Sequence, residues 1–180
     1  MAQFNKNLWA PWRMEYIRTL QDSTGKAECF LCGYWRQPDR DRENHVVWRT
    51  ASAFVVMNRF PYTNGHLLIA HGRHQGDLTD LTESDFDALN RTVRDAVRVL
   101  KETLSPDGFN IGLNLGRCAG AGLPDHLHTH IVPRWSGDTN FMAVLDGVRV
   151  VPDALDALWT ELVQAAEAAG LRQDSSDSRP

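Results

Sequence analysis

The sequence lacks a long hydrophobic run, since no stretch reaches the roughly 18 uninterrupted apolar residues of a membrane span. It also lacks an excess of positive charge, because 19 Lys and Arg face 23 Asp and Glu, for a formal net charge of -4. Proteins that bind long nucleic acids usually carry a basic face. We therefore expect no membrane and no long nucleic acid as partners, although a few backbone amides and side chains can still hold a small phosphate ligand.

Cysteine is scarce as well, with three residues in the chain. Two of them form the pair Cys29 and Cys32, which is not the pattern of a secreted disulfide framework. The first twenty residues contain Trp9 and Trp12 but neither the apolar region nor the small-residue cleavage site of an export signal. The sequence therefore predicts a soluble cytoplasmic protein with reduced thiols.

The length of 180 residues suits one domain with a good core and leaves little room for a second. We expect this domain to span 1–170, with an N-terminal extension at 1–28, a central motif region at 29–135 and a C-terminal helical region at 136–170. The polar tail at 171–180 is expected to be disordered.

Two short apolar or β-branched runs, 53–57 and 66–70, flank a segment rich in turn residues. This arrangement predicts a β-hairpin. Upstream of it, the charged stretch 37–44 is predicted to be a mobile loop. Further along, apolar residues alternate with polar ones over 109–115, which predicts a strand with one apolar face, followed by a Gly/Ala-rich connection at 116–122.

Two segments have helical patterns. From Glu83 to Leu104 apolar residues recur at steps of three and four, which predicts an amphipathic helix that begins after the cap residue Thr82. A second helix is predicted from about Ala154 to Ala169, capped by Asp153 and ended by Gly170.

The most informative pattern is three histidines at every second position, His126, His128 and His130, in a predicted strand at 125–133. In a strand this spacing places all three imidazoles on one face, about 7 Å apart. Burying several titratable rings is costly unless each finds a hydrogen-bond partner, so the pattern indicates function rather than packing. By spacing alone, the three rings could also share a metal ion.

With two apolar residues after the third histidine, the run His126–Val132 resembles the signature of the histidine triad (HIT) family of nucleotide-binding proteins. The segment 58–69 is similar to the family's upstream strand, turn and Gly-His-apolar strand. The resemblance covers roughly 29–135. It implies an α+β fold, in which a twisted, mainly antiparallel sheet carries the long helix and a C-terminal helix, and it implies a homodimer.

The resemblance also implies separate roles for the histidines. His128 would attack the α-phosphorus of a nucleotide and become transiently nucleotidylated, which suits an imidazole because its unperturbed pKa of about 6.5 leaves it neutral near pH 7. His130 would hydrogen-bond the phosphate or leaving-group oxygen, and His66 matches a further histidine beside the site. The alternative for His128 is a core histidine with satisfied nitrogens.

Four more residues are candidates for substrate binding. Asn114 matches an Asn that touches the phosphate in family members. Asn58 stands eight residues before His66, as an Asn near the nucleotide does in the fragile histidine triad branch, but it could equally bond its own backbone in the turn. Gly120 and Gly122 could let backbone amides approach a phosphate, although such a stretch can also be only a loop.

The spacing of Cys29 and Cys32 lets two thiolates reach one zinc ion, and a structural site needs two more ligands. By resemblance to zinc-containing family members, His74 and His126 complete the set, with His71 as a weaker substitute for His74. Such a zinc would anchor the N-terminal segment to the catalytic strand rather than act as a Lewis acid. The alternatives are two small apolar thiols in a turn or a redox pair.

One departure bears on the reaction. Gly122 stands where fragile histidine triad hydrolases carry Gln, whereas segments 8–13 and 133–141 resemble bacterial members described as diadenosine tetraphosphate phosphorylases. The resemblance therefore implies cleavage of dinucleoside polyphosphates, with inorganic phosphate as the second substrate and ADP and ATP as products. The alternatives are a hydrolase of dinucleoside polyphosphates or nucleoside phosphoramidates, and a purine-nucleotide-binding protein without turnover.

Overall fold

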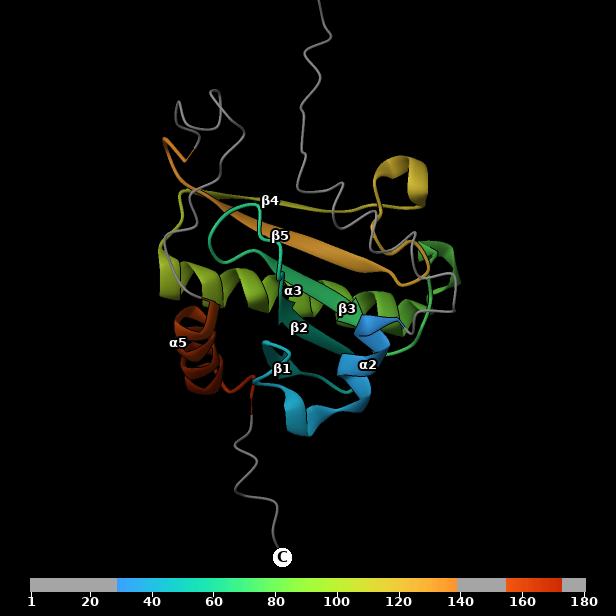
Figure 1. The fold of residues 1–180 in the computed structure, drawn as a ribbon, viewed down its shortest axis with the longest axis horizontal. Helices are drawn as coiled ribbons and strands as arrows, with labels where there is room; N and C mark the ends of the chain where they lie inside the picture. Colours follow the sequence, from blue (N-terminus) through green and yellow to red (C-terminus); the bar gives the residue numbers. More distant parts are fainter. Residues whose placement is uncertain (1–28, 139–154, 173–180) are drawn as a thin grey trace, which may run out of the picture.

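A computed structural model describes residues 29–138 and 155–172 (Figure 1). Within these ranges five strands form one antiparallel sheet in the order β1-β2-β3-β5-β4. The strands are β1 (Val46–Arg49), β2 (Ala53–Met57), β3 (Leu67–His71), β4 (Gly108–Leu113) and β5 (His128–Arg134). The described helices are α2 (Phe30–Arg36), α3 (Glu83–Leu104) and α5 (Leu155–Ala168), with 3-10 turns η1 (Pro38–Arg40), η2 (Leu78–Asp80) and η3 (Arg117–Ala119). The predicted α+β class with a mainly antiparallel sheet is confirmed.

Helix α3 has the bounds that the sequence predicts. Its cap Thr82 accepts a hydrogen bond from the backbone N–H of Asp85, which satisfies one of the unpaired donors of the first turn. The helix ends at Leu104, and the positive φ of 47° at the next residue, Ser105, turns the chain out of the helix. The long amphipathic helix therefore begins and ends at local signals.

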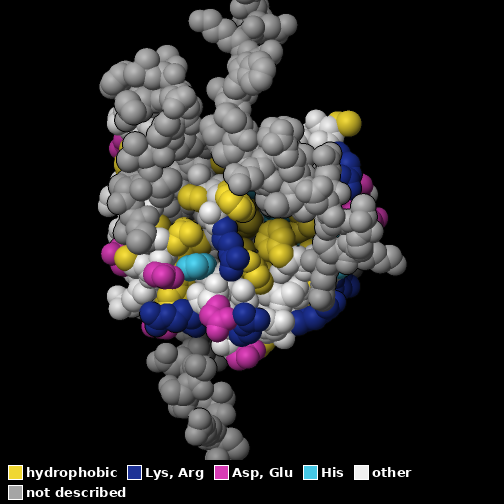
Figure 2. All heavy atoms as spheres, in the orientation of Figure 1, with side chains coloured by type: hydrophobic (Ala, Val, Ile, Leu, Met, Phe, Trp, Pro, Cys, Tyr) yellow, Lys and Arg dark blue, Asp and Glu magenta, His cyan; other side chains and the backbone are white. Residues whose placement is uncertain are grey.

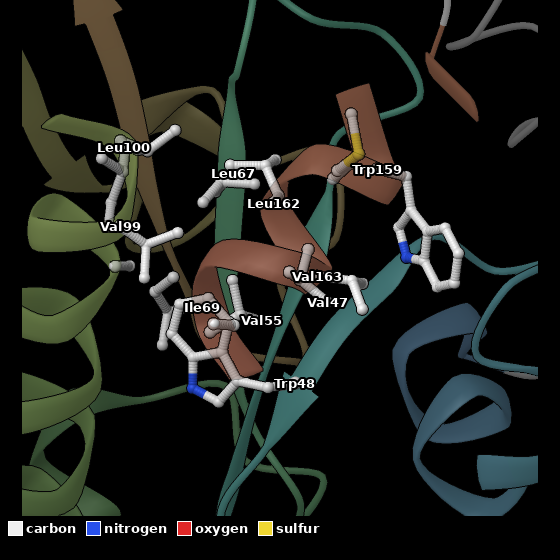
Figure 3. Close-up of a cluster of buried hydrophobic side chains, with 14 of the residues drawn as sticks. Val47, Trp48, Val55, Leu67, Ile69, Val99, Leu100, Trp159, Leu162 and Val163 are labelled. Carbon is white, nitrogen blue, oxygen red and sulfur yellow. The ribbon is translucent and has the colours of Figure 1, made fainter. Parts of the chain in front are cut away.

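The core lies between the sheet and the two long helices (Figure 3). In β2 and β3 alternate residues point to this face, where Val55 and Ile69 meet Leu100 of α3 and Leu162 of α5 in one buried cluster. Trp159 of α5 also donates its indole N–H to the carbonyl of Val46, at 3.0 Å. Both helices thus cover one face of the sheet.

The other alternate residues of β2 and β3 form a second, smaller cluster with Leu31 of α2. This face carries the histidines, because His130 and His128 are paired in register with Leu68 and Ala70 of β3, and paired positions of antiparallel strands share a face. The sheet therefore separates a helix-covered face from a face with α2 and the histidines.

Some predicted boundaries are wrong. Strand β5 begins at His128 rather than at residue 125, because its ladder with β3 ends at the pair Ala70 and His128 and the N–H of Leu127 instead donates to the carbonyl of Gln75. His126 therefore precedes the strand, and only two of the three histidines alternate on it. Strand β4 likewise ends at Leu113, two residues earlier than expected.

The charged stretch 37–44, predicted to be a mobile loop, contains η1 and two buried polar residues, Asp41 and Asn44. Asp41 pairs with Arg49 of β1, which fixes this stretch against the sheet. The tail predicted to be disordered from residue 171 begins with two packed residues: Leu171 hydrogen-bonds to Ala166, and Arg172 donates to the carbonyl of Val47 at 2.5 Å.

Several predictions fall on residues outside the described ranges. These are the extension at 1–28, the cap Asp153 and the tail at 173–180. In the part of the chain that is described, every helix is too short or too polar to cross a lipid bilayer.

Candidate active site and metal centre

A pocket of about 270 Å³ lies on the histidine face, and most of the candidate site residues meet there. Its lining includes His128, His130, Asn58, Asn114, Gly120 and Gly122. Figure 2 shows hydrophobic side chains near the middle of one face of the molecule, with basic side chains among and below them. The lining also includes the aromatic side chains of Phe30 and Tyr34, so the pocket combines convergent polar groups with an apolar wall, the usual character of a site for a small ligand.

His128 is held in one orientation inside this pocket. Its Nδ1 lies 2.9 Å from the backbone carbonyl of His126, so Nδ1 carries the proton that it donates. The lone pair then resides on Nε2. Burial lowers the pKa of His128 below its usual value, which keeps the ring neutral at neutral pH. The arrangement is that of a neutral imidazole prepared to attack an electrophile.

His66 and His130 form a directed hydrogen-bond chain beside it. The backbone N–H of Tyr62 donates to Nδ1 of His66 at 3.1 Å, so a neutral His66 has its proton on Nε2. That nitrogen lies 3.0 Å from Nδ1 of His130 and donates to it. His130 in turn keeps its own proton on Nε2. These hydrogen bonds therefore make Nε2 of His130 a donor. The ring centroids of His130 and His128 lie 4.9 Å apart.

Asn114 follows β4 directly. Gly112 pairs with His130, so the antiparallel register brings Asn114 opposite His128 on the pocket face. Asn58, at the end of β2, places its amide nitrogen 3.3 Å from Nδ1 of His66, and its side-chain oxygen accepts from the N–H of Phe60. Asn58 therefore makes the predicted bond within its own turn and also lines the pocket, where it contacts His66.

The apolar wall is the part of the pocket that the sequence does not predict. Phe30 and Tyr34 of α2 line it, with their rings in an edge contact at 5.4 Å. Arg59 lies over the Tyr34 ring at 5.7 Å, and Phe60 stands at the rim with 62% of its surface exposed. The signal that could have revealed the wall is the spacing of Phe30 and Tyr34, one helical turn apart beside the cysteines.

Four potential metal ligands lie next to this wall: Cys29, Cys32, His74 and His126. Their ligand atoms all lie within 4.8 Å of one another. Nε2 of His126 donates to the carbonyl of His71 at 2.7 Å, so its Nδ1 lone pair is directed at the cysteine sulfurs, 3.2 Å from Cys29 and 3.4 Å from Cys32. Burial lowers the pKa of His126 to about 4. The four residues could thus hold a metal ion.

The structure also distinguishes the two candidates for the fourth ligand. Nδ1 of His74 lies 3.3 Å from the sulfur of Cys32, within the cluster. His71 is buried and points elsewhere: its Nε2 lies 3.2 Å from Asp85, and its Nδ1 accepts from the N–H of Arg73. His71 therefore contributes its backbone carbonyl to the cluster rather than its ring.

Comparisons with known proteins give consistent results. The family model described as "HIT domain" matches residues 39–137. The protein named "AP-4-A phosphorylase" of Mycobacterium tuberculosis (strain ATCC 25618 / H37Rv) is 39% identical over 157 residues, which covers 83% of this chain and 78% of that protein. The "Bis(5'-nucleosyl)-tetraphosphatase [asymmetrical]" of Schizosaccharomyces pombe is 35% identical over 95 residues, covering 53% of this chain and 52% of that protein.

Among solved structures, a Zn-bound histidine triad family protein from Mycobacterium smegmatis superposes with a TM-score of 0.64 at 26% identity. The match covers 81% of this chain and 98% of that one. A histidine triad nucleotide-binding protein from Sulfolobus tokodaii has the same fold, with a TM-score of 0.63 at 23% identity over 84% of this chain and 99% of that one.

Proposed function

The chain belongs to the HIT domain family, and we propose that it is an enzyme that cleaves dinucleoside polyphosphates such as diadenosine tetraphosphate at the α-phosphorus, with phosphate as acceptor. The observation that carries the proposal is the orientation of His128. A neutral ring in a pocket, with Nδ1–H on the carbonyl of His126 and its lone pair on Nε2, is what a nucleophilic imidazole requires.

In the first step Nε2 of His128 attacks the α-phosphorus, and the bond from that phosphorus to the bridging oxygen breaks. The oxygen leaves with the electron pair as part of ATP, and AMP stays bonded to His128. The carbonyl of His126 stabilises the positive charge that develops on the ring through its hydrogen bond to Nδ1.

His130 and His66 assist the leaving group. With His66 donating to its Nδ1, His130 offers Nε2–H to an oxygen of the phosphate or of the departing ATP. Asn114, opposite His128, and the backbone near Gly120 and Gly122 bind the remaining phosphate oxygens, while Asn58 holds the ring of His66.

In the second step an oxygen of inorganic phosphate attacks the same phosphorus. The bond to Nε2 of His128 breaks, ADP forms, and the ring returns to its neutral state. The preference for phosphate over water rests on the relative named AP-4-A phosphorylase, which matches 83% of this chain, against 53% for the relative named as a tetraphosphatase.

The apolar wall provides the surface for a purine base. Phe30 and Tyr34 can contact one adenine while the polyphosphate extends toward His128. The other adenosine leaves with the ATP.

For the metal centre, we propose a structural zinc ion held by Cys29, Cys32, His74 and His126. Two thiolates and two imidazoles are a preferred donor set for zinc, and the similar Mycobacterium smegmatis protein is Zn-bound. A bound zinc ion would cross-link distant segments of the chain. It would not act as a Lewis acid on the substrate, because protein residues would fill all four positions of a closed tetrahedral site.

We further propose a homodimer formed through β4. In the described part of the sheet this strand is at the edge; Ile111 within it is 48% exposed and Leu115 just beyond it is 43% exposed. Light scattering on the purified protein measures the mass, and a monomeric mass at micromolar concentration would contradict the dimer.

Product analysis tests the proposed reaction. The protein is incubated with diadenosine tetraphosphate with and without inorganic phosphate, and the nucleotides are separated. Phosphate-dependent formation of ADP and ATP is expected. AMP and ATP formed without phosphate would identify a hydrolase instead, and intact substrate in both reactions would contradict enzymatic cleavage.

A further inference from the structure

Helix α2 faces two sites at once. Cys29 is its cap residue and Cys32 lies in its first turn, so both cysteine candidates for the metal belong to this helix. Phe30 and Tyr34, one turn apart on another side of the helix, line the pocket. A movement of α2 relative to the sheet would therefore change the metal centre and the apolar wall together.

The helix is too short to be stable without tertiary anchors, since it has only seven residues. Its C-terminal end is fixed by Arg49, which donates to the carbonyls of Tyr34 at 2.7 Å and Trp35 at 3.1 Å. At its N-terminal end Cys29 provides no side-chain cap hydrogen bond. At this end Leu31 is buried, and the sulfurs of the two cysteines contact His126 and His74.

His128 is held in a different way. It lies in β5 between two neighbouring strands, paired with Ala70 of β3, and its ring bonds to the backbone carbonyl of His126 rather than to a metal-binding atom. The pairing with β3 therefore positions the backbone of the nucleophile, whereas the metal ligands hold the Phe30 end of the wall.

We propose that metal bound by Cys29, Cys32, His74 and His126 holds Phe30, at the N-terminal end of the apolar wall, so that metal occupancy sets nucleotide affinity rather than the rate of the chemical step. This inference rests on the proposed function for the identity of the ligand. Cys29 and Cys32 act as positioning residues for a base that they do not touch.

Binding of ADP to zinc-loaded and chelator-treated protein, measured by calorimetry in phosphate-free buffer, tests this inference. Removal of zinc is expected to weaken ADP binding about tenfold, the loss typical of one aromatic contact to a base. Inorganic tripolyphosphate has no base and should bind both forms within about twofold. Equal affinity of ADP for the two forms would overturn the inference, as would an equal weakening of tripolyphosphate.

Failure of the proposed function gives a different result, because diadenosine tetraphosphate would then stay intact with the zinc-loaded protein whether or not ADP binds. With diadenosine tetraphosphate, zinc removal should raise KM and leave kcat within about twofold, whereas a change confined to kcat would contradict the inference.

A thermodynamic cycle with Phe30→Ala distinguishes an effect of zinc on the wall from an effect of zinc on the stability of the whole fold. Phe30 is 38% exposed, so its truncation leaves the core intact. In this variant zinc removal should change ADP affinity by less than about twofold, because the contact that zinc positions is already gone. A tenfold loss in both backgrounds would show that zinc acts elsewhere.

A second variant covers the case in which metal-free protein loses its circular dichroism signal. Cys29→Ala removes one ligand and leaves three in place, so this variant is measured instead of the chelator-treated protein. The matched control is Cys118→Ala, because Cys118 is an exposed cysteine outside the cluster. Weakened ADP binding in Cys29→Ala alone supports the inference, and the same affinity in both variants contradicts it.

Discussion

The two faces of the sheet are built on different principles. The face under α3 and α5 buries a continuous apolar cluster that includes Leu100, Leu158 and Leu162. The opposite face has a smaller apolar cluster, and its short helix α2 is held by Arg49 and by the cysteine and histidine cluster. Beside α2 the face is hollowed into the pocket.

The two faces therefore contribute to different properties, one to stability and the other to the reaction. Apolar burial is non-directional and contributes to the free energy of unfolding in rough proportion to area, which suits the helix-covered face. The histidine face instead uses directed hydrogen bonds that assign each imidazole nitrogen a role. Substitutions on the two faces should therefore affect different measurements.

The largest effect is expected on the histidine face. His128→Ala should lower kcat for diadenosine tetraphosphate by at least about a thousandfold, because it removes the group that forms the covalent intermediate. The free energy of unfolding should change less than for a core substitution, since the ring lines the pocket and belongs to neither apolar cluster. Steady-state kinetics and urea unfolding measure the two quantities.

The control is His45→Ala, which removes a histidine that contacts Asp156 at 2.8 Å, away from the pocket. It should keep kcat within about twofold. If His128→Ala retained more than a tenth of the activity, the proposed nucleophile would be wrong.

The reverse pattern is expected on the helix-covered face. Leu162→Ala should lower the free energy of unfolding by about 3 kcal/mol, because it leaves a cavity in the fully buried cluster. The kcat of the folded fraction should not change. Urea unfolding of this variant is compared with Glu161→Ala in the same helix, whose exposed side chain should contribute less than about 0.5 kcal/mol. A strong loss of kcat at full folding would contradict the separation of the two faces.

A smaller effect is expected from pH. Burial lowers the pKa of His126 to about 4, whereas in the unfolded chain it is about 6.5. Between these values the unfolded chain binds a proton that the folded chain does not, so the free energy of unfolding falls as pH falls from about 6.5 to 4, by up to about 1.4 kcal/mol per pH unit. Above pH 6.5 this group contributes no slope.

Urea titrations of chelator-treated protein at several pH values measure the dependence without competition from metal. The pKa of His128 is lowered in the same direction, so both buried imidazoles contribute to the slope. A free energy of unfolding that stayed constant from pH 6.5 to 4.5 would argue against both rings being buried in the neutral state.

The elements with the clearest local signals could be predicted from the sequence. Helix α3 and strand β2 have their predicted bounds, because a cap, a periodic face and turn residues mark them. Helix α2 and strand β1 were missed, since seven and four residues are too few for a periodic pattern to emerge. Their formation depends on tertiary partners such as Arg49.

The candidate site was predicted by a different route, from the motif resemblance rather than from local signals. The residues predicted for the metal, Cys29, Cys32, His74 and His126, lie together, because the motif resemblance supplied the long-range pairing that spacing alone cannot. The wall formed by Phe30 and Tyr34 was not predicted, since aromatic residues in a short segment carry no sign of what they face. The exclusion of His71 depends on Asp85, a residue of another element.

The most direct test of the central claim is to isolate the intermediate. The protein is incubated with diadenosine tetraphosphate in phosphate-free buffer, digested at neutral pH and analysed by mass spectrometry. We expect AMP bonded to the peptide that contains His128, and its release as ADP when inorganic phosphate is added before digestion. An adduct on another residue, or phosphate-dependent turnover with no adduct on any peptide, would contradict the account.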